Sequence, residues 1–326
     1  MLRDGLLHRI TPIHDEPVSS WLPPSYENAL QEQHRHFCIR RFAGPDIHSS
    51  QLESLRIAHL TDLHVGRITP MHIQYEAVRI TNATNPDAVV ITGDFVCHSQ
   101  LYLDALHDVI RRFRAPVICV LGNHDHWSGG KEVAWALRKA GAEVLSNANT
   151  VITLGHQRLQ LVGLDDSYTG QANIHQAVKG LNPRYATLGL SHIAEEADGL
   201  WRYGVPLVLS GHTHAGQITV ARLHEIAIGR LAGHRYIHGL YGQRDLNQGA
   251  VYVSAGIGSA VLPIRIGQRA KREITLFELG HRPGSFVEPI AEQLAYPAGR
   301  APSMRTQYRR AMTVLRKELR RQKRKR

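Results

Sequence analysis

Five short apolar runs in this sequence each end in residues that can hold a metal ion or move a proton. The runs are IAHL, VVIT, VICVL, LGLS and LVLS, and each has the composition of a buried β-strand. Polar residues at the carboxyl ends of neighbouring strands meet at one edge of a sheet. In chain order, the five endings are Thr61-Asp62-Leu63-His64, Gly93-Asp94, Gly122-Asn123-His124-Asp125, His192 and Gly211-His212-Thr213-His214.

The residue types in these endings indicate a particular kind of metal chemistry. Carboxylate, imidazole and amide oxygen ligands without a thiolate suit Mn, Fe or Zn in a reactive centre. The ligand-type residues are too many for one ion, and they suit two ions that share a carboxylate. Two ions about 3.5–4 Å apart can activate a hydroxide and stabilise an in-line phosphoryl displacement. The predicted ligands are Asp62, His64, Asp94, Asn123, His192, His212 and His214.

Taken singly, each motif also has a purely structural explanation. Gly-Asp after a strand is usually a turn, and Asp-x-His is more often a cap than a ligand pair. His212 and His214 point to one side of an extended segment, and two such imidazoles are costly to bury without partners. The glycines before Asp94, Asn123 and His212 permit sharp turns and close backbone approach. The five endings together favour the metal centre.

The elements that must position these residues are strands alternating with helices, which indicates an α/β fold. We expect helices near 72–82, 101–113 and 131–140. After residue 142 the helices become fewer, which suggests a second sheet packed on the first, and 220–248 reads as a long loop over the site. The expected strands are 56–60, 88–92, 117–121, 158–164, 186–190, 207–210, 249–254 and 273–279.

Three regions follow from this pattern. Residues 1–50 are interrupted by prolines and are expected to form an N-terminal extension with one short helix near 26–36. Residues 51–281 are expected to form the catalytic domain. Residues 282–326 form a basic C-terminal tail. The chain of 326 residues with 43% hydrophobic residues is long and apolar enough to bury a core.

Nearly all of the net charge of +11 lies in the tail, because residues 305–326 hold eleven Lys and Arg residues against the single acid Glu318. Apolar residues three or four positions apart predict a basic amphipathic helix here. A solvated basic terminus, an anionic membrane surface and nucleic acid, in that order, are compatible with this pattern. The apolar stripe consists of Met304, Tyr308, Met312, Leu315 and Leu319.

The cysteines and the N-terminus bear on the compartment. Cys38, Cys97 and Cys119 have no zinc-type or redox spacing, and so sparse a set suits a reducing environment. We find no signal-peptide pattern and no apolar run long enough to span a membrane. The expected location is the cytoplasm, with the inner face of the membrane as a peripheral site. The sequence does not indicate an oligomeric state.

The ordered motifs resemble the calcineurin-like metallophosphoesterase superfamily over about residues 55–280. The segments GLDD, LSGHTHAGQI and VYVSAGIGSAVLPIRIGQRAKREITLFEL resemble its bacterial YkuE/YaeI-type branch. The resemblance implies a four-layer sandwich of two mixed β-sheets flanked by helices. It also implies a hydrolase with two divalent metal ions, of which manganese is the first expectation and iron or zinc the alternatives.

The resemblance assigns roles to residues. Asp62, His64, Asp94 and His214 would hold one ion, and Asp94, Asn123, His192 and His212 the other, with Asp94 as the bridge. A hydroxide between the ions would be the nucleophile. His124 would donate a proton to the leaving oxygen, and Asp125 would orient His124. Apart from the resemblance, we expect His126, beside Trp127, to be a rim or substrate-side residue rather than a ligand.

This sequence departs from the branch at two points. Ala215 stands where the branch usually has glycine, which removes no ligand. His192 is followed by Ile193-Ala194 where the branch usually has Asn-Pro, so His175 and His224 are alternative candidates for that ligand.

The branch includes phosphodiesterases and enzymes that cleave the pyrophosphate of UDP-2,3-diacylglucosamine in lipid A biosynthesis. That lipid pyrophosphatase activity is our specific functional prediction, because a basic tail could hold the protein at the membrane where such a nucleotide-lipid lies. A general phosphodiesterase or nuclease acting on nucleotides is the alternative. A non-catalytic scaffold is more remote, because every predicted ligand and His124 are present. Residues 126–132 and 220–248 are the loops expected to choose the substrate.

Overall fold

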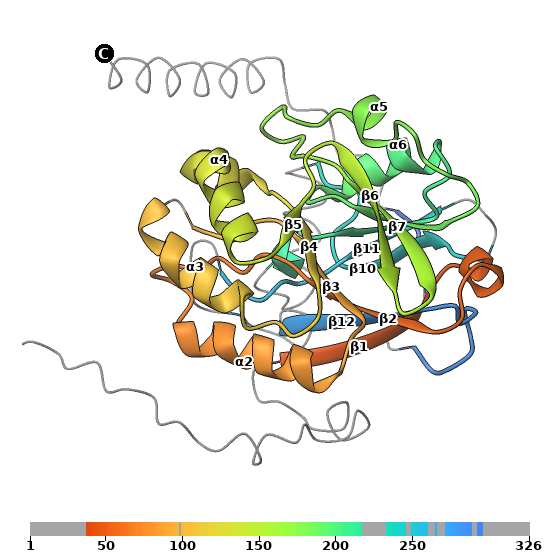
Figure 1. Ribbon diagram of the computed structural model, residues 1–326, viewed down its shortest axis with the longest axis horizontal. Helices are drawn as coiled ribbons and strands as arrows, with labels where there is room; N and C mark the ends of the chain where they lie inside the picture. Colours follow the sequence, from red (N-terminus) through yellow and green to blue (C-terminus); the bar gives the residue numbers. More distant parts are fainter. Residues whose placement is uncertain are drawn as a thin grey trace, which may run out of the picture.

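Two stacked β-sheets form the centre of the protein, and helices lie on their outer sides (Figure 1). The computed structural model describes residues 37–97, 99–216, 233–245, 249–259, 265, 271–288 and 292–295. The predicted helices near 26–36 and in the basic tail, and the alternative ligand His224, lie outside these residues. The description below therefore concerns the described part of the chain.

The first sheet has the strand order β1-β12-β2-β3-β4-β5. Strands β2 to β5 run parallel, whereas β12 pairs antiparallel with β2 and parallel with β1. The sheet is therefore mixed. Its strands are β1 (Phe37–Ala43), β2 (Leu55–Leu60), β3 (Ala88–Thr92), β4 (Val117–Val120), β5 (Glu143–Val144) and β12 (Arg272–Leu279).

The second sheet has the strand order β10-β11-β9-β8-β7-β6 and is also mixed. Strands β7, β8, β9 and β11 run parallel, and the two outer strands pair antiparallel with their neighbours. Its strands are β6 (Ala148–Leu154), β7 (Gln157–Gly163), β8 (Ala186–Leu190), β9 (Leu207–Ser210), β10 (Gly239–Gln243) and β11 (Gly249–Val253).

Alternation along the strands explains the four layers. In β3, Val89 and Ile91 pack in one core cluster with residues of the helices α2, α3 and α4, whereas Ala88 and Val90 pack in a second cluster with residues of the other sheet. A third cluster joins the far side of the second sheet to α6. Successive side chains of a strand point to opposite faces, so strands buried on both faces are apolar throughout. The helices are α2 (Met71–Ala83), α3 (Leu103–Ile110), α4 (Asn123–Lys139), α5 (Ile174–Ala177) and α6 (Ala197–Trp201), with 3-10 turns η2 (Asp46–Ser50), η3 (Gln100–Tyr102), η4 (Ala194–Glu196) and η5 (His214–Gly216).

The predicted fold class, an α/β sandwich of two mixed sheets flanked by helices, is confirmed. Two predictions about elements need correction. Helix α4 begins at Asn123 rather than near Lys131, and Gly129 with φ of 118° marks a kink inside it. Part of the segment expected to be a loop over the site, 220–248, forms strand β10, whose backbone pairs with β11. No described helix has both the length and the apolar character needed to cross a membrane.

The structure also bears on where the folded domain begins and ends. Strand β1, in the segment expected as an N-terminal extension, forms an edge of the first sheet and pairs with Arg272–Glu278 of β12. In the segment expected as the tail, Glu288 and Glu292 form ion pairs with buried Arg244 at 2.6 and 2.7 Å. We therefore propose residues 37–295 as the bounds of the catalytic domain, with the basic tail beyond them.

Candidate metal centre

The carboxyl ends of strands from both sheets bring the predicted ligands together in two groups that share Asp94. In each group the candidate ligand atoms lie within 4.8 Å of one another. All of the predicted carboxylate and histidine ligands belong to one group or the other. The first group is Asp62, His64, Asp94 and His214, and the second is Asp94, His192 and His212.

In the first group, imidazole nitrogen and carboxylate oxygen atoms lie close to one another. Nε2 of His64 lies 3.0 Å from Nε2 of His214. Nε2 of His214 lies 3.3 Å from Oδ1 of Asp62, and Nε2 of His64 lies 3.6 Å from Oδ2 of Asp94. Four side chains from three strand ends thus direct nitrogen and oxygen atoms at one point, as ligands around a cation do.

The second group includes the predicted amide ligand. Oδ1 of Asn123 lies 3.0 Å from Nδ1 of His212 and 3.2 Å from Nε2 of His192. Nε2 of His192 also lies 3.4 Å from Oδ2 of Asp94. The structure therefore places His192 among the ligand candidates, although the residues that follow it differ from the branch pattern.

Each carboxylate has one oxygen held by a backbone amide and the other directed into the centre. Oδ2 of Asp62 accepts hydrogen bonds from the Thr61 hydroxyl at 2.9 Å and the His212 amide at 3.1 Å. Its Oδ1 is buried and has no hydrogen-bond partner among the described residues. Oδ1 of Asp94 accepts from the His124 amide at 2.9 Å, and its Oδ2 faces the imidazoles. A buried, unpaired carboxylate oxygen is costly unless a cation or a donor meets it.

The ring of His192 is fixed in an orientation that suits a ligand. Its Nδ1 lies 2.7 Å from the Thr92 carbonyl oxygen, which can only accept a hydrogen bond, so Nδ1 carries the proton in that bond. Nε2 is then free to present its lone pair to the second group. Metal-binding histidines commonly donate their other ring N–H to such a carbonyl or carboxylate.

The backbone at the centre is strained. Five of the seven predicted ligands have positive φ, and Ala215 has φ of 49°. A left-handed conformation costs a residue other than glycine roughly 1–2 kcal/mol, and such strain clusters at functional sites. The rest of the fold must therefore hold these loops in place. The five are Asp62 (53°), His64 (45°), Asp94 (54°), His212 (74°) and His214 (52°).

Glycines let the loops of the centre pass close to one another, as the sequence predicted. A Cβ on Gly122 would lie 2.3 Å from Oδ1 of Asp94, and one on Gly211 would lie 2.4 Å from Oδ2 of Asp62. Gly93 has φ of 89°, and its missing Cβ would lie 2.8 Å from Nδ1 of His192. At these three positions any larger residue would push on a predicted ligand.

The electrostatics of the centre favour a bound cation. Burial lowers the pKa of His64 and of His214 to about 3, so both imidazoles are neutral and their lone pairs are available. Burial also lowers the pKa of His192, but the carboxylates of Asp94 and Asp62 outweigh it and raise that pKa to about 10. The raised pKa of His192 shows that the carboxylates favour positive charge at this point, which divalent cations would supply.

These observations fit a pair of divalent metal ions. The donor set has carboxylates, imidazoles and one amide oxygen, its atoms converge on two neighbouring points, and one carboxylate lies between them. Such donors suit Mn, Fe or Zn. The assignment of individual residues as ligands stays a prediction.

The two predicted catalytic residues lie at the first turn of α4. His124 is 13% exposed, and its Nε2 lies 3.9 Å from Oδ2 of Asp94. Buried Asp125 accepts backbone hydrogen bonds from Phe95, Val96 and Gly122 at 2.8, 3.1 and 2.9 Å. Asp125 thus ties the loop that carries Asp94 to the loop that carries His124.

An aromatic rim lies beside the centre. The Trp127 ring lies 4.9 Å from the His124 ring and 6.1 Å from the Tyr168 ring, between centroids. Tyr168 in turn lies 5.5 Å from His212. Trp127 is 40% exposed and Tyr168 47% exposed, so solvent reaches both rings.

The other histidines named from the sequence lie elsewhere. Nε2 of His126 lies 2.7 Å from Oδ1 of Asp165, close to the rim residue Trp127 in the chain. Nδ1 of His175 lies 2.9 Å from the exposed Tyr203 hydroxyl, in neither ligand group.

Sequence reasoning missed three residues at the site. Tyr168 completes the aromatic rim, Arg265 places Nη2 3.4 Å from Nδ1 of His214, and Cys97 lies in a group with His64 and His124. All three lie far in the chain from the residues they approach, and no local spacing indicates them. Arg265 stands inside the quoted segment that ends at Leu279, so its charge in an apolar stretch was an available signal.

The sequence of this chain is similar to those of known proteins. The family model of the calcineurin-like phosphoesterases matches residues 55–216. YkuE of Bacillus subtilis strain 168, an uncharacterized metallophosphoesterase, is 30% identical over 233 residues, covering 70% of this chain and 79% of YkuE. Phosphodiesterase YaeI of Escherichia coli K12 is 31% identical over 232 residues, covering 69% of this chain and 82% of YaeI. Among solved structures, the 5′-nucleotidase precursor from Thermus thermophilus is 20% identical with a TM-score of 0.37, over 49% of this chain and 42% of that one.

The chain belongs to the calcineurin-like metallophosphoesterase family, whose members use divalent metals, and it is a hydrolase that acts on phosphoester bonds. Within the family it is similar to the bacterial proteins YkuE and YaeI, as the sequence motifs predicted.

Proposed function

We propose that this enzyme cleaves a phosphodiester or pyrophosphate bond in a nucleotide-lipid, with UDP-2,3-diacylglucosamine in lipid A biosynthesis as the specific substrate. The observation that carries this proposal is the exposed aromatic pair Trp127 and Tyr168 beside His124 and His212. Flat exposed rings next to a phosphoryl centre suit a substrate with a nucleobase, because base–aromatic stacking contributes about 1–3 kcal/mol per base.

The proposed ligand roles follow the two groups. Asp62, His64, Asp94 and His214 would hold one divalent ion, and Asp94, Asn123, His192 and His212 the other, with manganese as the first expectation. When bound, the ions would polarise the phosphoryl oxygens and lower the pKa of a bound water molecule. The chain fixes this geometry through the strained loops and the backbone bonds to Asp62 and Asp94.

His124 is the proposed proton donor to the leaving oxygen. Its ring is partly exposed, it lies beside Oδ2 of Asp94, and its backbone amide holds the other oxygen of that carboxylate. Because Asp125 anchors the first turn of α4, it would keep His124 at a constant distance from the shared carboxylate.

An exposed apolar side chain on the element next to α4 supports a lipid substrate. Leu101 in η3 is 89% exposed, and the neighbouring Gln100 side chain donates a 2.8 Å hydrogen bond to the Ser128 carbonyl of α4. Leu101 and Trp127 therefore lie on adjacent elements and offer apolar surface for an acyl chain. The basic residues 304–326 would add attraction to an anionic membrane, about 1 kcal/mol for each basic residue near the surface.

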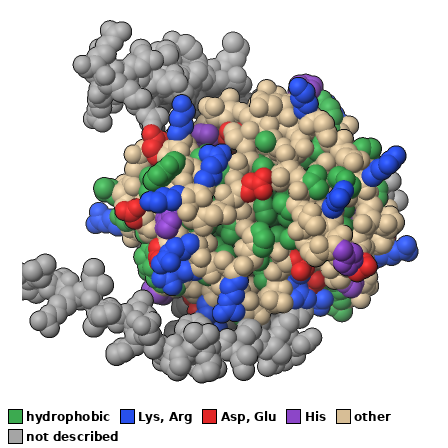
Figure 2. All heavy atoms as spheres, viewed as in Figure 1, with side chains coloured by type: hydrophobic (Ala, Val, Ile, Leu, Met, Phe, Trp, Pro, Cys, Tyr) green, Lys and Arg blue, Asp and Glu red, His purple; other side chains and the backbone are tan. Residues whose placement is uncertain are grey.

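The charge distribution is relevant to the alternative, a nuclease or general nucleotide phosphodiesterase. On the face seen in Figure 2, the Lys and Arg side chains of the described residues are scattered and interleaved with acids. They form no continuous stripe on that face of the described part. A protein that follows a nucleic-acid strand usually offers such a stripe. This observation favours the nucleotide-lipid.

The first test is release of UMP from UDP-2,3-diacylglucosamine by the purified, manganese-loaded protein, with bis-p-nitrophenyl phosphate as a model diester. We expect UMP release far above the rate for the model diester. Equal cleavage of UDP-sugars that lack acyl chains would favour the nucleotide alternative. Cleavage of the model diester alone would refute the proposed substrate while leaving the phosphoesterase activity.

Two tryptophans of α4 provide a matched pair of variants for the rim. Trp127→Ala should raise KM for the nucleotide-lipid about tenfold through lost stacking, with a smaller effect on the model diester. Trp135 is 62% exposed on the same helix and packs on Lys139, with a ring-to-ammonium distance of 5.0 Å. Trp135→Ala is therefore the control. Equal changes in both variants would contradict a role for Trp127 in substrate binding.

The tail can be tested separately. Truncation after Ser303 should abolish sedimentation with anionic liposomes and leave hydrolysis of the soluble model diester unchanged. If the truncated protein still sediments with anionic liposomes, the tail is not the membrane anchor.

A further inference from the structure

Cys97 forms a third group of candidate ligands with His64 and His124, in which the ligand atoms lie within 4.8 Å of one another. We propose that these three side chains form an additional ion site, which takes a thiophilic divalent cation such as Zn²⁺ or Cd²⁺ and inhibits the enzyme when occupied. A thiolate with two imidazoles is a donor set that selects such ions over Mn²⁺ or Mg²⁺. It is also the one ligand group here that contains sulfur among the described residues.

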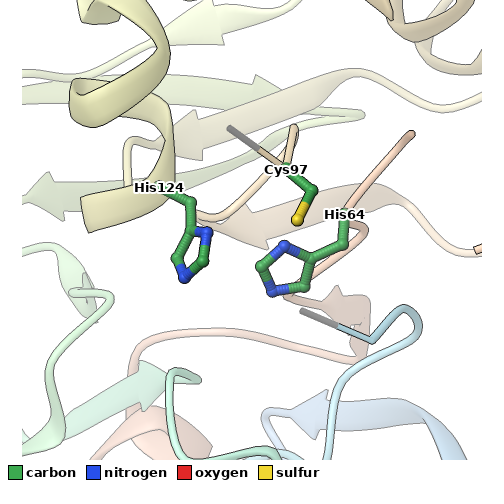
Figure 3. A group of neighbouring side chains, drawn as sticks. All are labelled: His64, Cys97 and His124. Carbon is green, nitrogen blue, oxygen red and sulfur yellow. The ribbon is translucent and has the colours of Figure 1, made fainter. Parts of the chain in front are cut away.

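His64 offers a second ring nitrogen to this site. Its Nε2 faces His214 in the first ligand group, whereas its Nδ1 is buried and has no hydrogen-bond partner among the described residues. In Figure 3 the ring edge of His64 nearest to Cys97 carries a nitrogen atom, directed toward the sulfur. A fully buried imidazole nitrogen without a partner is costly, and a hydrogen-bond acceptor, or an ion that displaces the Nδ1 proton, would satisfy it.

The three side chains converge from three different elements. Figure 3 shows His64 on the loop after β2, Cys97 on the loop after β3 and His124 on the first turn of α4, pointing toward one another. The rings of His64 and His124 are nearly perpendicular, at 83°, with centroids 4.8 Å apart. Each donor atom thus approaches from its own direction, as the corners of a tetrahedral site require.

The distances between the three donor atoms are close to those around a tetrahedral ion. Around tetrahedral zinc, bond lengths of about 2.3 Å to sulfur and 2.0–2.1 Å to nitrogen place ligand atoms about 3.3–3.6 Å apart. The donor atoms here lie at most 4.8 Å apart, so side-chain movements of about 1 Å would bring them to bonding distance from a common ion. Substrate, water or another ligand could take the fourth position.

Binding at this site has a chemical consequence. The ion would replace the thiol proton of Cys97 and the Nδ1 proton of His64, both released to solvent, and it would bind a ring nitrogen of His124. On the proposed function, His124 could then no longer donate its proton to the leaving oxygen. Loss of general acid catalysis lowers turnover by about 100-fold or more. The inhibition, but not the binding, rests on the proposed function.

The test is a Cd²⁺ titration of the full-length, manganese-loaded protein, followed by the ultraviolet charge-transfer absorption of cadmium thiolate. We expect one equivalent of Cd²⁺ to produce the band and elemental analysis to show both equivalents of manganese retained. Turnover of an alkyl phosphodiester, whose leaving oxygen needs a proton, should fall about 100-fold. Cys97→Ser should remove the band and most of the inhibition, each measured against that variant's own activity. Cys38→Ser is the matched control, since Cys38 lies on β1 outside every ligand group described here, and it should behave as wild type.

Three outcomes would separate the possibilities. A band that persists in Cys97→Ser would overturn the proposal, and so would loss of one manganese for each cadmium bound. A cadmium band on a manganese-loaded protein that hydrolyses no phosphoester would support the ion site and refute the proposed function instead.

Discussion

Replacement of Gly122 by alanine tests whether the position of Asp94 controls the metal centre. Gly122 has φ of −108° and ψ of 179°, an extended conformation that alanine adopts without strain. The added Cβ would lie 2.3 Å from Oδ1 of Asp94 and 2.6 Å from the Asp94 amide nitrogen. The substitution therefore acts by steric contact with the carboxylate that both ligand groups share.

The magnitude follows from these distances. Ordinary contact with a Cβ begins near 3.4 Å, so the Asp94 carboxylate must move by about 1 Å. A shift of that size breaks ligand bonds of about 2.0–2.2 Å. We expect Gly122→Ala to lower the free energy of unfolding by about 1–3 kcal/mol, as overpacking does. Hydrolysis of the model diester should fall at least 100-fold, in line with the effect of a misplacement of about 1 Å.

The assay combines metal content by elemental analysis, model-diester turnover and urea unfolding. Gly155→Ala is the contrasting control, because Gly155 has φ of 61° in the β6–β7 turn and a Cβ there meets no atom within 4 Å. It should lose about 1 kcal/mol of stability through backbone strain and keep both metals and full turnover. If Gly122→Ala keeps two metals and wild-type turnover, then the position of Asp94 does not control the metal centre.

Three further predictions concern the shared carboxylate, the proton donor and a buried ion pair. Asp94→Asn should lower the occupancy of both ions, measured by elemental analysis, and loss of a single ion would contradict the bridging role. His124→Ala should lower cleavage of alkyl esters by about 100-fold and of p-nitrophenyl esters by less, since p-nitrophenolate leaves without a proton; equal losses would exclude the proton-donor role. Burial raises the pKa of Glu273, but Arg40 and His238 outweigh it and hold that pKa far below its ordinary value of 4.5. The stability that Glu273 contributes is therefore complete above about pH 4.5 and is lost as the pH falls further. Glu273→Gln should lower the free energy of unfolding in urea by about 3 kcal/mol at pH 7, and it should make that free energy depend less on pH in the acid range.

Several elements could be predicted from the sequence because local pattern and tertiary role agree. The run AVVIT of β3 is apolar on both faces because helices cover one face and the second sheet covers the other. The residues that follow β2, β3 and β4 could be predicted to converge because parallel strands end at the same edge.

Other elements could not be predicted because tertiary contacts determine them. Strand β10 has the sequence GLYGQ, whose two glycines read as loop, and its hydrogen bonds to β11 make it a strand. The start of α4 at Asn123 was hidden by Gly129 and Gly130, and the carboxylate of Asp125 stabilises it by accepting the Gly122 amide.

The details of the centre were equally beyond the sequence. Which nitrogen of His192 carries the proton depends on the Thr92 carbonyl, 100 residues away in the chain. The approach of Cys97 to His64 and His124 depends on three loops at once, and the spacing of the three cysteines gave no indication of it.

The place of β12 in the first sheet has a consequence for the synthesis of this protein. Although β12 is the last of the described strands along the chain, it lies between β1 and β2, the first two of them. A ribosome that adds about 5–20 residues per second needs roughly 10–40 s to reach Leu279 after it has passed Leu60. During that interval β2, which leads into Asp62 and His64, has an open hydrogen-bonding edge that can pair with another chain. The first sheet can therefore be completed, with the metal ligands in their final geometry, only after Leu279 has been synthesised.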